Sequence, residues 1–219
     1  MEMHGSTSHY RIVQHGTTRL LGRGAMILIH GRGSSAADIL TLTSYFGRDD
    51  LLYLAPEAPS SQWYPLPFMA PLERNEPGIT NGMHAIDDAF MILAQNGIGP
   101  AQTVLLGFSQ GACLALEYAA RNARRYGGVA GLSGGLIGPD GTPRAYDGSL
   151  ESTPVFLGCS DVDAHIPVHR VHEAHEVFER MGADVTERIY PGMPHTINED
   201  EIAFVRRLLE DLVERRREP

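Results

Sequence analysis

Residues 104–112 read Val104-Leu105-Leu106-Gly107-Phe108-Ser109-Gln110-Gly111-Ala112, an apolar run that leads through a serine between two glycines into small residues. The apolar run is typical of a buried strand, and the small residues after it are typical of a helix start. A serine on so tight a turn has a strained backbone, and larger flanking side chains would collide with the strand and the helix. The free N–H groups of the helix start favour developing negative charge. The pattern predicts that Ser109 is a nucleophile.

On both sides of this stretch, short apolar or β-branched runs alternate with longer helical stretches, which is typical of a mostly parallel sheet. Several of the runs are apolar throughout, as expected for strands covered by helices on both faces. Seven strands are predicted at residues 10–14, 25–30, 51–55, 103–106, 128–132, 154–158 and 185–190. Helices are predicted at residues 36–46, 82–95, 110–125, 168–181 and 199–216. The sequence therefore predicts an α/β fold, and the serine turn between a buried strand and a helix indicates the α/β-hydrolase type.

Two segments interrupt this alternation, residues 57–80 with five prolines and residues 134–153 with many Gly, Pro and Asp residues. Long loops in compact domains are usually lids or binding loops. Their apolar side chains either pack on the core or line a substrate pocket, and the pocket candidates are Trp63, Tyr64, Phe68, Leu136 and Ile137. Trp63 is the preferred candidate because it opens its segment near the strand ends. No repeat or linker is recognisable, so residues 1–219 are expected to form one domain.

A serine hydroxyl needs a base to remove its proton and a carboxylate to orient that base. In an α/β-hydrolase the chain order is nucleophile, acid, base, which removes every histidine before Ser109 from the ten in the chain. His195 lies in a turn between the last predicted strand and the last predicted helix, where the base belongs. Asp161 and Asp163 both follow the strand at 154–158, and spacing alone does not choose between them.

Four blocks of this sequence resemble the phospholipase/carboxylesterase family of α/β-hydrolases. They are residues 28–33 (LIHGRG), 107–112 (GFSQGA), 163–167 (DAHIP) and 190–197 (YPGMPHTI), in the family's order. The resemblance implies that the acid is Asp163 and that the backbone N–H groups of Arg32 and Gln110 form an oxyanion hole. It also implies a serine carboxylesterase that acts on small esters without a cofactor. An acyl thioesterase or lysophospholipase is the alternative.

The composition of the chain limits the classes of binding partner that are expected. The formal charge of −9 at pH 7 opposes binding to phosphate backbones, so no nucleic acid is expected. Cys113 and Cys159 lie in apolar runs and indicate no disulfide framework. No stretch resembles a signal peptide or a membrane span, which predicts a cytoplasmic protein. The sequence leaves a homodimer open.

Two readings compete with a serine enzyme. His165, His169, His172 and His175 have spacings that allow a shared helix face and a metal ion, but His172-Glu173-Ala174-His175 is one residue shorter than the zinc-protease pattern. These helical histidines are expected to be solvated, and no metal is expected. The other reading is a non-catalytic ligand-binding protein with a hydrolase fold.

Overall fold

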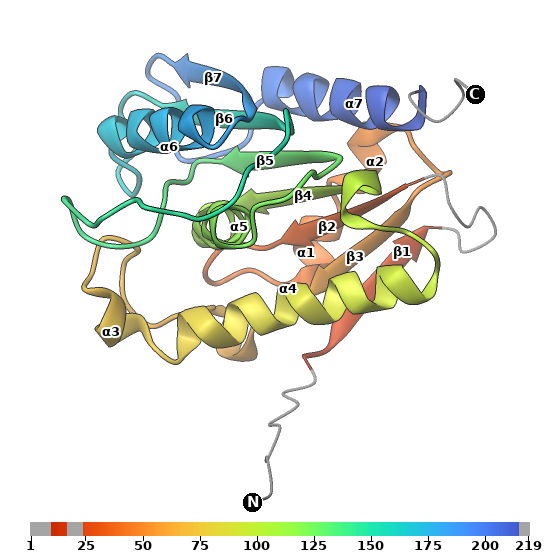
Figure 1. The fold of residues 1–219 in the computed structure, drawn as a ribbon, viewed down its shortest axis with the longest axis horizontal. Helices are drawn as coiled ribbons and strands as arrows, with labels where there is room; N and C mark the ends of the chain where they lie inside the picture. The colour runs from red at the N-terminus through yellow and green to blue at the C-terminus, as the bar shows by residue number, and fades with distance from the viewer. Residues whose placement is uncertain (1–9, 17–23, 215–219) are drawn as a thin grey trace, which may run out of the picture.

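A seven-stranded sheet forms the centre of the molecule (Figure 1). The computed structural model describes residues 10–16 and 24–214. The strand order is β1-β3-β2-β4-β5-β6-β7; β1 runs antiparallel to β3, and every other neighbouring pair is parallel. The strands are β1 (Ile12–Gly16), β2 (Ala25–Ile29), β3 (Leu52–Pro56), β4 (Thr103–Phe108), β5 (Gly128–Leu132), β6 (Pro154–Ser160) and β7 (Asp184–Tyr190). The predicted α/β architecture is confirmed.

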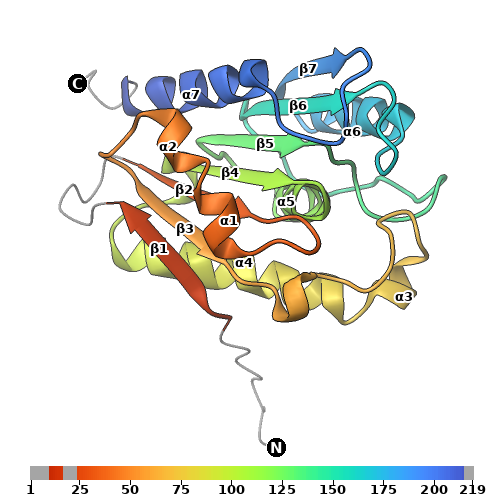
Figure 2. The ribbon, with the colours of Figure 1, turned by 180° about the vertical axis from the view of Figure 1, so that it is seen from behind.

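Helices cover both faces of the sheet, and each face has its own apolar core. The helices are α1 (Ala36–Leu40), α2 (Thr43–Phe46), α3 (Leu72–Asn75), α4 (Gly78–Gln95), α5 (Gln110–Arg121), α6 (Val168–Arg180) and α7 (Glu199–Glu214). Short 3₁₀ turns lie at Pro59–Ser61 and Pro100–Gln102. Helices α4, α5 and α6 contribute to one core and α1, α2 and α7 to the other, as the front view of Figure 1 and the back view of Figure 2 show.

Strand β2 shows why these apolar runs become strands. Ile27 and Ile29 enter the core under α4 and α5, whereas Met26 and Leu28 enter the core under α1 and α7. Successive side chains of a strand point to opposite faces, so a central strand with helices on both sides must be apolar at every position. All five residues of β2 are buried.

Element boundaries differ from the sequence-based prediction in several places. The helix predicted at 36–46 is two short helices, α1 and α2, and the helix predicted to start at Gly82 starts at Gly78. The irregular segment after β3 is therefore shorter than predicted and contains α3. Helix α5 ends at Arg121 rather than at residue 125, and the last two residues predicted for α7 lie outside the described residues.

The strand order places a crevice between β2 and β4. The chain leaves β2 toward β3 on one side, and after α4 it returns to β4 on the other side of β2. In an open parallel sheet, ligands bind where the order reverses in this way, beyond the carboxyl ends of the strands. Arg32 follows β2 and Ser109 follows β4, so both lie at this point.

Candidate active site

Ser109 lies on a strained turn between β4 and α5. Its φ and ψ are 55° and −120°, a region that residues other than glycine rarely adopt. A Cβ on Gly107 would lie 2.2 Å from the carbonyl oxygen of Gly111, and a Cβ on Gly111 would lie 2.2 Å from that of Ile29. Only glycine at both positions allows the turn to pack this tightly between β2 and α5. The packing holds the serine hydroxyl at the wall of a cavity.

His195 connects Ser109 to a buried carboxylate. Its Nε2 lies 2.8 Å from Ser109 Oγ, and its Nδ1 lies 2.6 Å from Asp163 Oδ2. An ionised carboxylate only accepts hydrogen bonds, so Nδ1 carries a proton and donates to Asp163. Nε2 of a neutral imidazole is then free to accept the serine proton. The ring of Phe108 lies against the imidazole, with 5.1 Å between ring centroids.

Asp163 is held in its ionised form. Burial alone would raise the pKa of this carboxyl, but hydrogen bonds from His195 and from the N–H groups of His165 and Ile166 outweigh burial and lower it. The two backbone groups donate to Oδ1 at 2.8 Å and 3.0 Å, which leaves Oδ2 for His195. The Asp163 side chain is 0% exposed and the His195 side chain 21% exposed. The carboxylate is therefore fixed, whereas the imidazole faces the cavity.

Asp161, the other candidate acid, has a different contact. Its Oδ1 accepts a hydrogen bond of 2.7 Å from the N–H of Gly192, in the turn that carries His195. The structure thus brings Asp163, and not Asp161, to the imidazole. Asp161 fixes the backbone of the turn instead.

The loop after β2 is held in place through His30. The N–H of Ala58 donates to His30 Nε2 at 3.1 Å, so the ring proton lies on Nδ1, which donates to the carbonyl oxygen of Gly31 at 2.8 Å. Trp63 Nε1 donates to the carbonyl oxygen of His30 at 2.8 Å. These bonds position Arg32 at the cavity opposite Gln110. As the first residue of α5, Gln110 has an N–H group for which the helix offers no acceptor.

The Arg32 guanidinium is a clamp for the segment after β3. It donates to Gln62 Oε1 and to the carbonyl oxygens of Tyr64, Pro65 and Leu66, at 2.8 to 2.9 Å. The Gln110 side chain adds two further bonds, accepting from the N–H of Trp63 at 3.0 Å and donating to the carbonyl oxygen of Tyr64 at 2.7 Å. The residues whose backbones flank the nucleophile therefore also hold the segment in place.

This segment and the nucleophile enclose a cavity of about 480 Å³. Of the predicted pocket residues, Tyr64 and Phe68 line it. Trp63, Leu136 and Ile137 belong to the same buried core but are not among the residues that line the cavity, so this part of the prediction is wrong. Trp63 instead packs against His30, with 5.0 Å between ring centroids. The other lining residues are Gly31, Arg32, Ser34, Pro65, Pro67, Phe108, Ser109, Gln110, Cys113, His165, Ile166 and His195.

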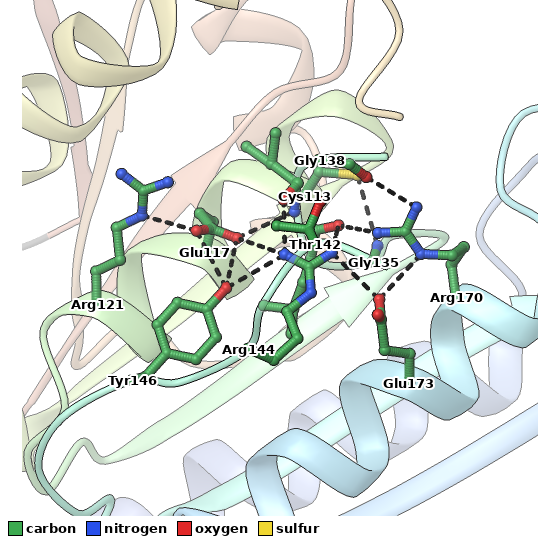
Figure 3. A network of polar contacts seen from close by, with 12 residues as sticks. Cys113, Glu117, Arg121, Gly135, Gly138, Thr142, Arg144, Tyr146, Arg170 and Glu173 are labelled. Atoms are coloured by element: carbon green, nitrogen blue, oxygen red, sulfur yellow. Dashed lines mark hydrogen bonds and ion pairs between the residues drawn. The ribbon is translucent and has the colours of Figure 1, made fainter. Parts of the chain in front are cut away.

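A charged network holds the segment after β5 behind the cavity (Figure 3). The guanidinium of Arg144 donates to the carbonyl oxygens of Leu136 and Ile137, and that of Arg170 donates to those of Leu136 and Gly138. Glu117 of α5 accepts from the N–H of Ile137, while Glu173 of α6 accepts from both arginines.

Phe68 connects this network to the cavity. The carbonyl oxygen of Phe68 accepts from the N–H of Gly138, and the Arg170 guanidinium lies 5.1 Å from the centre of the Phe68 ring. The network thus supports one wall of the cavity.

Sequence reasoning missed several residues of the site. Phe108 occupies the variable position of the serine motif, and Cys113 lies one helical turn after Ser109, a spacing that could have placed it in the cavity. Burial raises the pKa of Cys113 to about 12, so its thiol stays protonated near neutral pH. His165 lies two residues after Asp163, and its ring meets His195 edge-on at 4.8 Å. No pattern in the sequence predicts that Phe108 and His165 pack against the imidazole of His195.

The helical histidines lie beside carboxylates, and His175 lies 3.4 Å from both Glu179 and Glu187. His169 lies 3.2 Å from Asp140, and His172 lies 2.8 Å from Glu187. Within residues 10–16 and 24–214, no group of His, Cys, Asp or Glu side chains has the geometry to hold a metal ion.

Comparison with known proteins identifies the family. The model of the phospholipase/carboxylesterase family matches residues 17–213. The chain belongs to this family. It is therefore an enzyme of the carboxylesterase and acyl-protein thioesterase group of hydrolases.

Similar proteins agree in fold and length. The crystal structure of a phospholipase/carboxylesterase from Dyadobacter fermentans is 39% identical, with a TM-score of 0.88 over 92% of this chain and 97% of that chain. The crystal structure of esterase PE8 is 27% identical, with a TM-score of 0.74 over 91% and 97%. Acyl-protein thioesterase 1 of Kluyveromyces lactis is 26% identical over 82% of this chain and 88% of the relative. Among the helices that the structure describes, none has the length and apolar character needed to cross a membrane.

Proposed function

We propose that this protein is a serine carboxylesterase that hydrolyses small carboxylic esters through an acyl-enzyme on Ser109. His195 removes the proton from Ser109 Oγ, which bonds to the ester carbonyl carbon. The leaving alcohol takes that proton from His195 as its bond to the carbon breaks. Water then attacks the acyl-enzyme by the same route and restores Ser109.

The N–H groups of Arg32 and Gln110 are proposed to stabilise the oxyanion. Two donors fixed before the reaction each contribute about 3 to 4 kcal/mol to the transition state. Arg32 and Gln110 both line the cavity beside Ser109. The hydrogen bonds of their side chains to residues 62–66 support this role, because they keep both backbones in place without substrate.

One observation carries the proposal. Ser109, His195 and Asp163 come from three separate loops, yet their side chains form a continuous hydrogen-bonded chain of 2.8 Å and 2.6 Å that opens into a cavity. The strained backbone of Ser109 is a second support, since strain of this kind is concentrated at functional sites.

Substitution of the serine tests the assignment. Ser109→Ala is expected to reduce kcat for a short p-nitrophenyl ester by about 10⁶-fold, as loss of a catalytic serine does in other hydrolases. Thermal unfolding followed by circular dichroism is expected to show a folded variant, because the lost hydroxyl makes no core contact. A variant with the activity of the wild type would refute the role of Ser109.

An acyl thioesterase is the second candidate, because the relatives in yeasts are named acyl-protein thioesterases. The cavity of about 480 Å³ favours a short acyl group. Rates for esters and thioesters with acyl chains of two to twelve carbons distinguish the two candidates. A carboxylesterase of the proposed kind prefers esters with short chains, whereas a rate that increases up to the longest thioester would favour the alternative.

A further inference from the structure

A second hollow begins on the far side of His195. This groove has a volume of about 810 Å³ and runs between α2 and α7, which lie side by side. Its apolar wall consists of Leu42, Tyr45, Phe108, Ile197, Ile202 and Ala203. Phe108 and His195 line both the groove and the cavity. The groove thus adjoins the candidate active site across these two side chains.

The groove is an apolar surface without a partner in the described structure. Tyr45 is 61% exposed, although large apolar side chains are usually covered. Arg206 donates to the carbonyl oxygen of Tyr45 at 2.9 Å, which ties α7 to α2 across the groove. The polar groups of Asn198 are engaged in capping α7 through Glu201. The wall therefore offers contact area for an apolar group, with the side chains of Thr196 and Glu199 as polar neighbours in the lining.

The proposed reaction decides which part of a substrate reaches this groove. The imidazole of His195 must hand its proton to the leaving oxygen or sulfur, so the leaving group lies on the His195 side of Ser109. The acyl group then lies on the side of Tyr64 and Phe68, in the cavity. A leaving group longer than a few atoms extends past His195 and Phe108, where the groove begins.

We propose that the groove between α2 and α7 binds the apolar alcohol or thiol portion of the substrate. The inference rests on the proposed esterase function. It assigns the two ends of an ester to two separate surfaces, with the acyl group in the cavity and the leaving group in the groove.

Acetate esters of n-alkyl alcohols from methyl to hexyl test the assignment, since these alcohols differ little in reactivity. We expect kcat/KM to rise about two- to fourfold for each added methylene that the groove covers. Ala203→Trp fills the groove and is expected to remove most of this rise. Tyr45→Ser removes part of the wall at an exposed position, so folding is preserved, and it is expected to reduce the rise.

Ala94→Trp is the matched control, because it makes the same substitution at an exposed position of α4, on the face of the sheet opposite to α2 and α7. It is expected to keep the dependence of the wild type on alcohol length. If the wild type and the three variants all show the same dependence of kcat/KM on alcohol length, the groove assignment is overturned and the proposed esterase function is unaffected. The groove assignment would also be overturned if Phe68→Ala abolished the dependence of kcat/KM on alcohol length while the groove variants left it unchanged.

Two further measurements separate the remaining outcomes. If no ester is hydrolysed, the proposed function fails, and binding of hexan-1-ol to Ser109→Ala then tests the groove alone. Shifts of the Ile202 and Ala203 amide resonances on titration support binding, and unchanged resonances overturn it. Light scattering gives the oligomeric state. If the wild type is a dimer that Tyr45→Ser dissociates, a second copy of this chain occupies the groove, and the proposal is overturned.

Discussion

The site consists of two regions that are built differently. The side chains of Ser109, Asp163 and His195, here called the platform, follow three strands and contact one another through two directed hydrogen bonds. The other region, here called the wall, consists of residues 57–77, which contribute to the cavity lining, and residues 134–147, which support them from behind. It has little regular structure and is held mainly through backbone carbonyl oxygens that accept from Arg32, Arg144 and Arg170. In the proposed reaction each platform residue has a separate chemical task, whereas the wall has several attachments that share one task. Substitutions in the platform should therefore affect turnover, and those in the wall should affect stability and substrate binding.

The largest expected effect distinguishes Asp163, the proposed acid, from the nearby Asp161. Asp163→Asn is expected to lower kcat about 10³- to 10⁴-fold, because an amide in this position favours the wrong tautomer of His195. Asp161→Asn is the control, since its amide oxygen can still accept from Gly192, and it is expected to lose less than about tenfold. Steady-state kinetics with one short ester measures both. Equal losses in the two variants would contradict the distinction between them.

The pH dependence of activity tests the charge of the platform. His195 must be neutral to accept the serine proton, so kcat/KM is expected to fall about tenfold per pH unit on the acidic side. The lowered pKa of Asp163 keeps this carboxylate ionised over the same range, so one proton, not two, should control the decline. Initial rates between about pH 4 and pH 8, with circular dichroism as a check on folding, give the slope. A decline of about a hundredfold per unit would show that Asp163 is protonated as well.

Arg32 connects the two regions and should show a mixed effect. Arg32→Ala keeps the backbone N–H but removes four hydrogen bonds to residues 62–66. The expected results are a loss of about 1 to 3 kcal/mol in the free energy of unfolding and a rise in KM that exceeds the fall in kcat. Arg32→Lys keeps the charge but not the forked geometry, so it should restore only part of both properties.

Urea unfolding and steady-state kinetics on the same samples separate the two effects of Arg32→Ala. Unchanged stability together with a large fall in kcat would show that the guanidinium acts on the reaction and not on the wall.

The smallest expected effect concerns Glu201, which is buried at the start of α7 against Gly158. Burial raises the pKa of Glu201 to about 7, and a hydrogen bond from Asn198 offsets only part of this rise. The neutral acid fits the folded protein better than the carboxylate does. The corresponding stability is present below the pKa of the unfolded chain and is lost as the pH rises through about 7.

Glu201→Gln should remove this pH dependence. Between about pH 5 and pH 8, the wild type should lose about 2 kcal/mol more in the free energy of unfolding than the variant. Urea unfolding at both pH values measures the difference. Parallel losses in the two proteins would show that Glu201 does not titrate in this range.

The platform was easier to predict from sequence than the wall. Ser109 and His195 lie in short motifs whose backbone is determined by glycine and proline, and the chain order of the fold limits where the base and acid can lie. Asp161 and Asp163 both lie within three residues of the end of β6, so the choice between them depends on which carboxylate faces His195. That orientation depends on the turn at residues 161–166, where the N–H groups of His165 and Ile166 fix Asp163.

The wall was predicted only in part, because apolar side chains in irregular segments carry no periodic signal. Trp63 and Phe68 lie in the same Pro-rich apolar stretch, yet Trp63 packs against the loop after β2 and Phe68 reaches the cavity. The difference arises from contacts between distant residues, such as Arg32 with Tyr64 and Gly138 with Phe68. No local pattern in the sequence encodes such contacts.

Detection of the acyl-enzyme tests the central claim most directly. The wild type mixed with p-nitrophenyl butyrate, quenched in acid within milliseconds and digested, can be analysed by peptide mass spectrometry. We predict a butyryl group on the peptide that contains Ser109, formed in the wild type and absent from Ser109→Ala. A butyryl group on another residue, such as Cys113, or turnover without any acylated peptide would contradict the account.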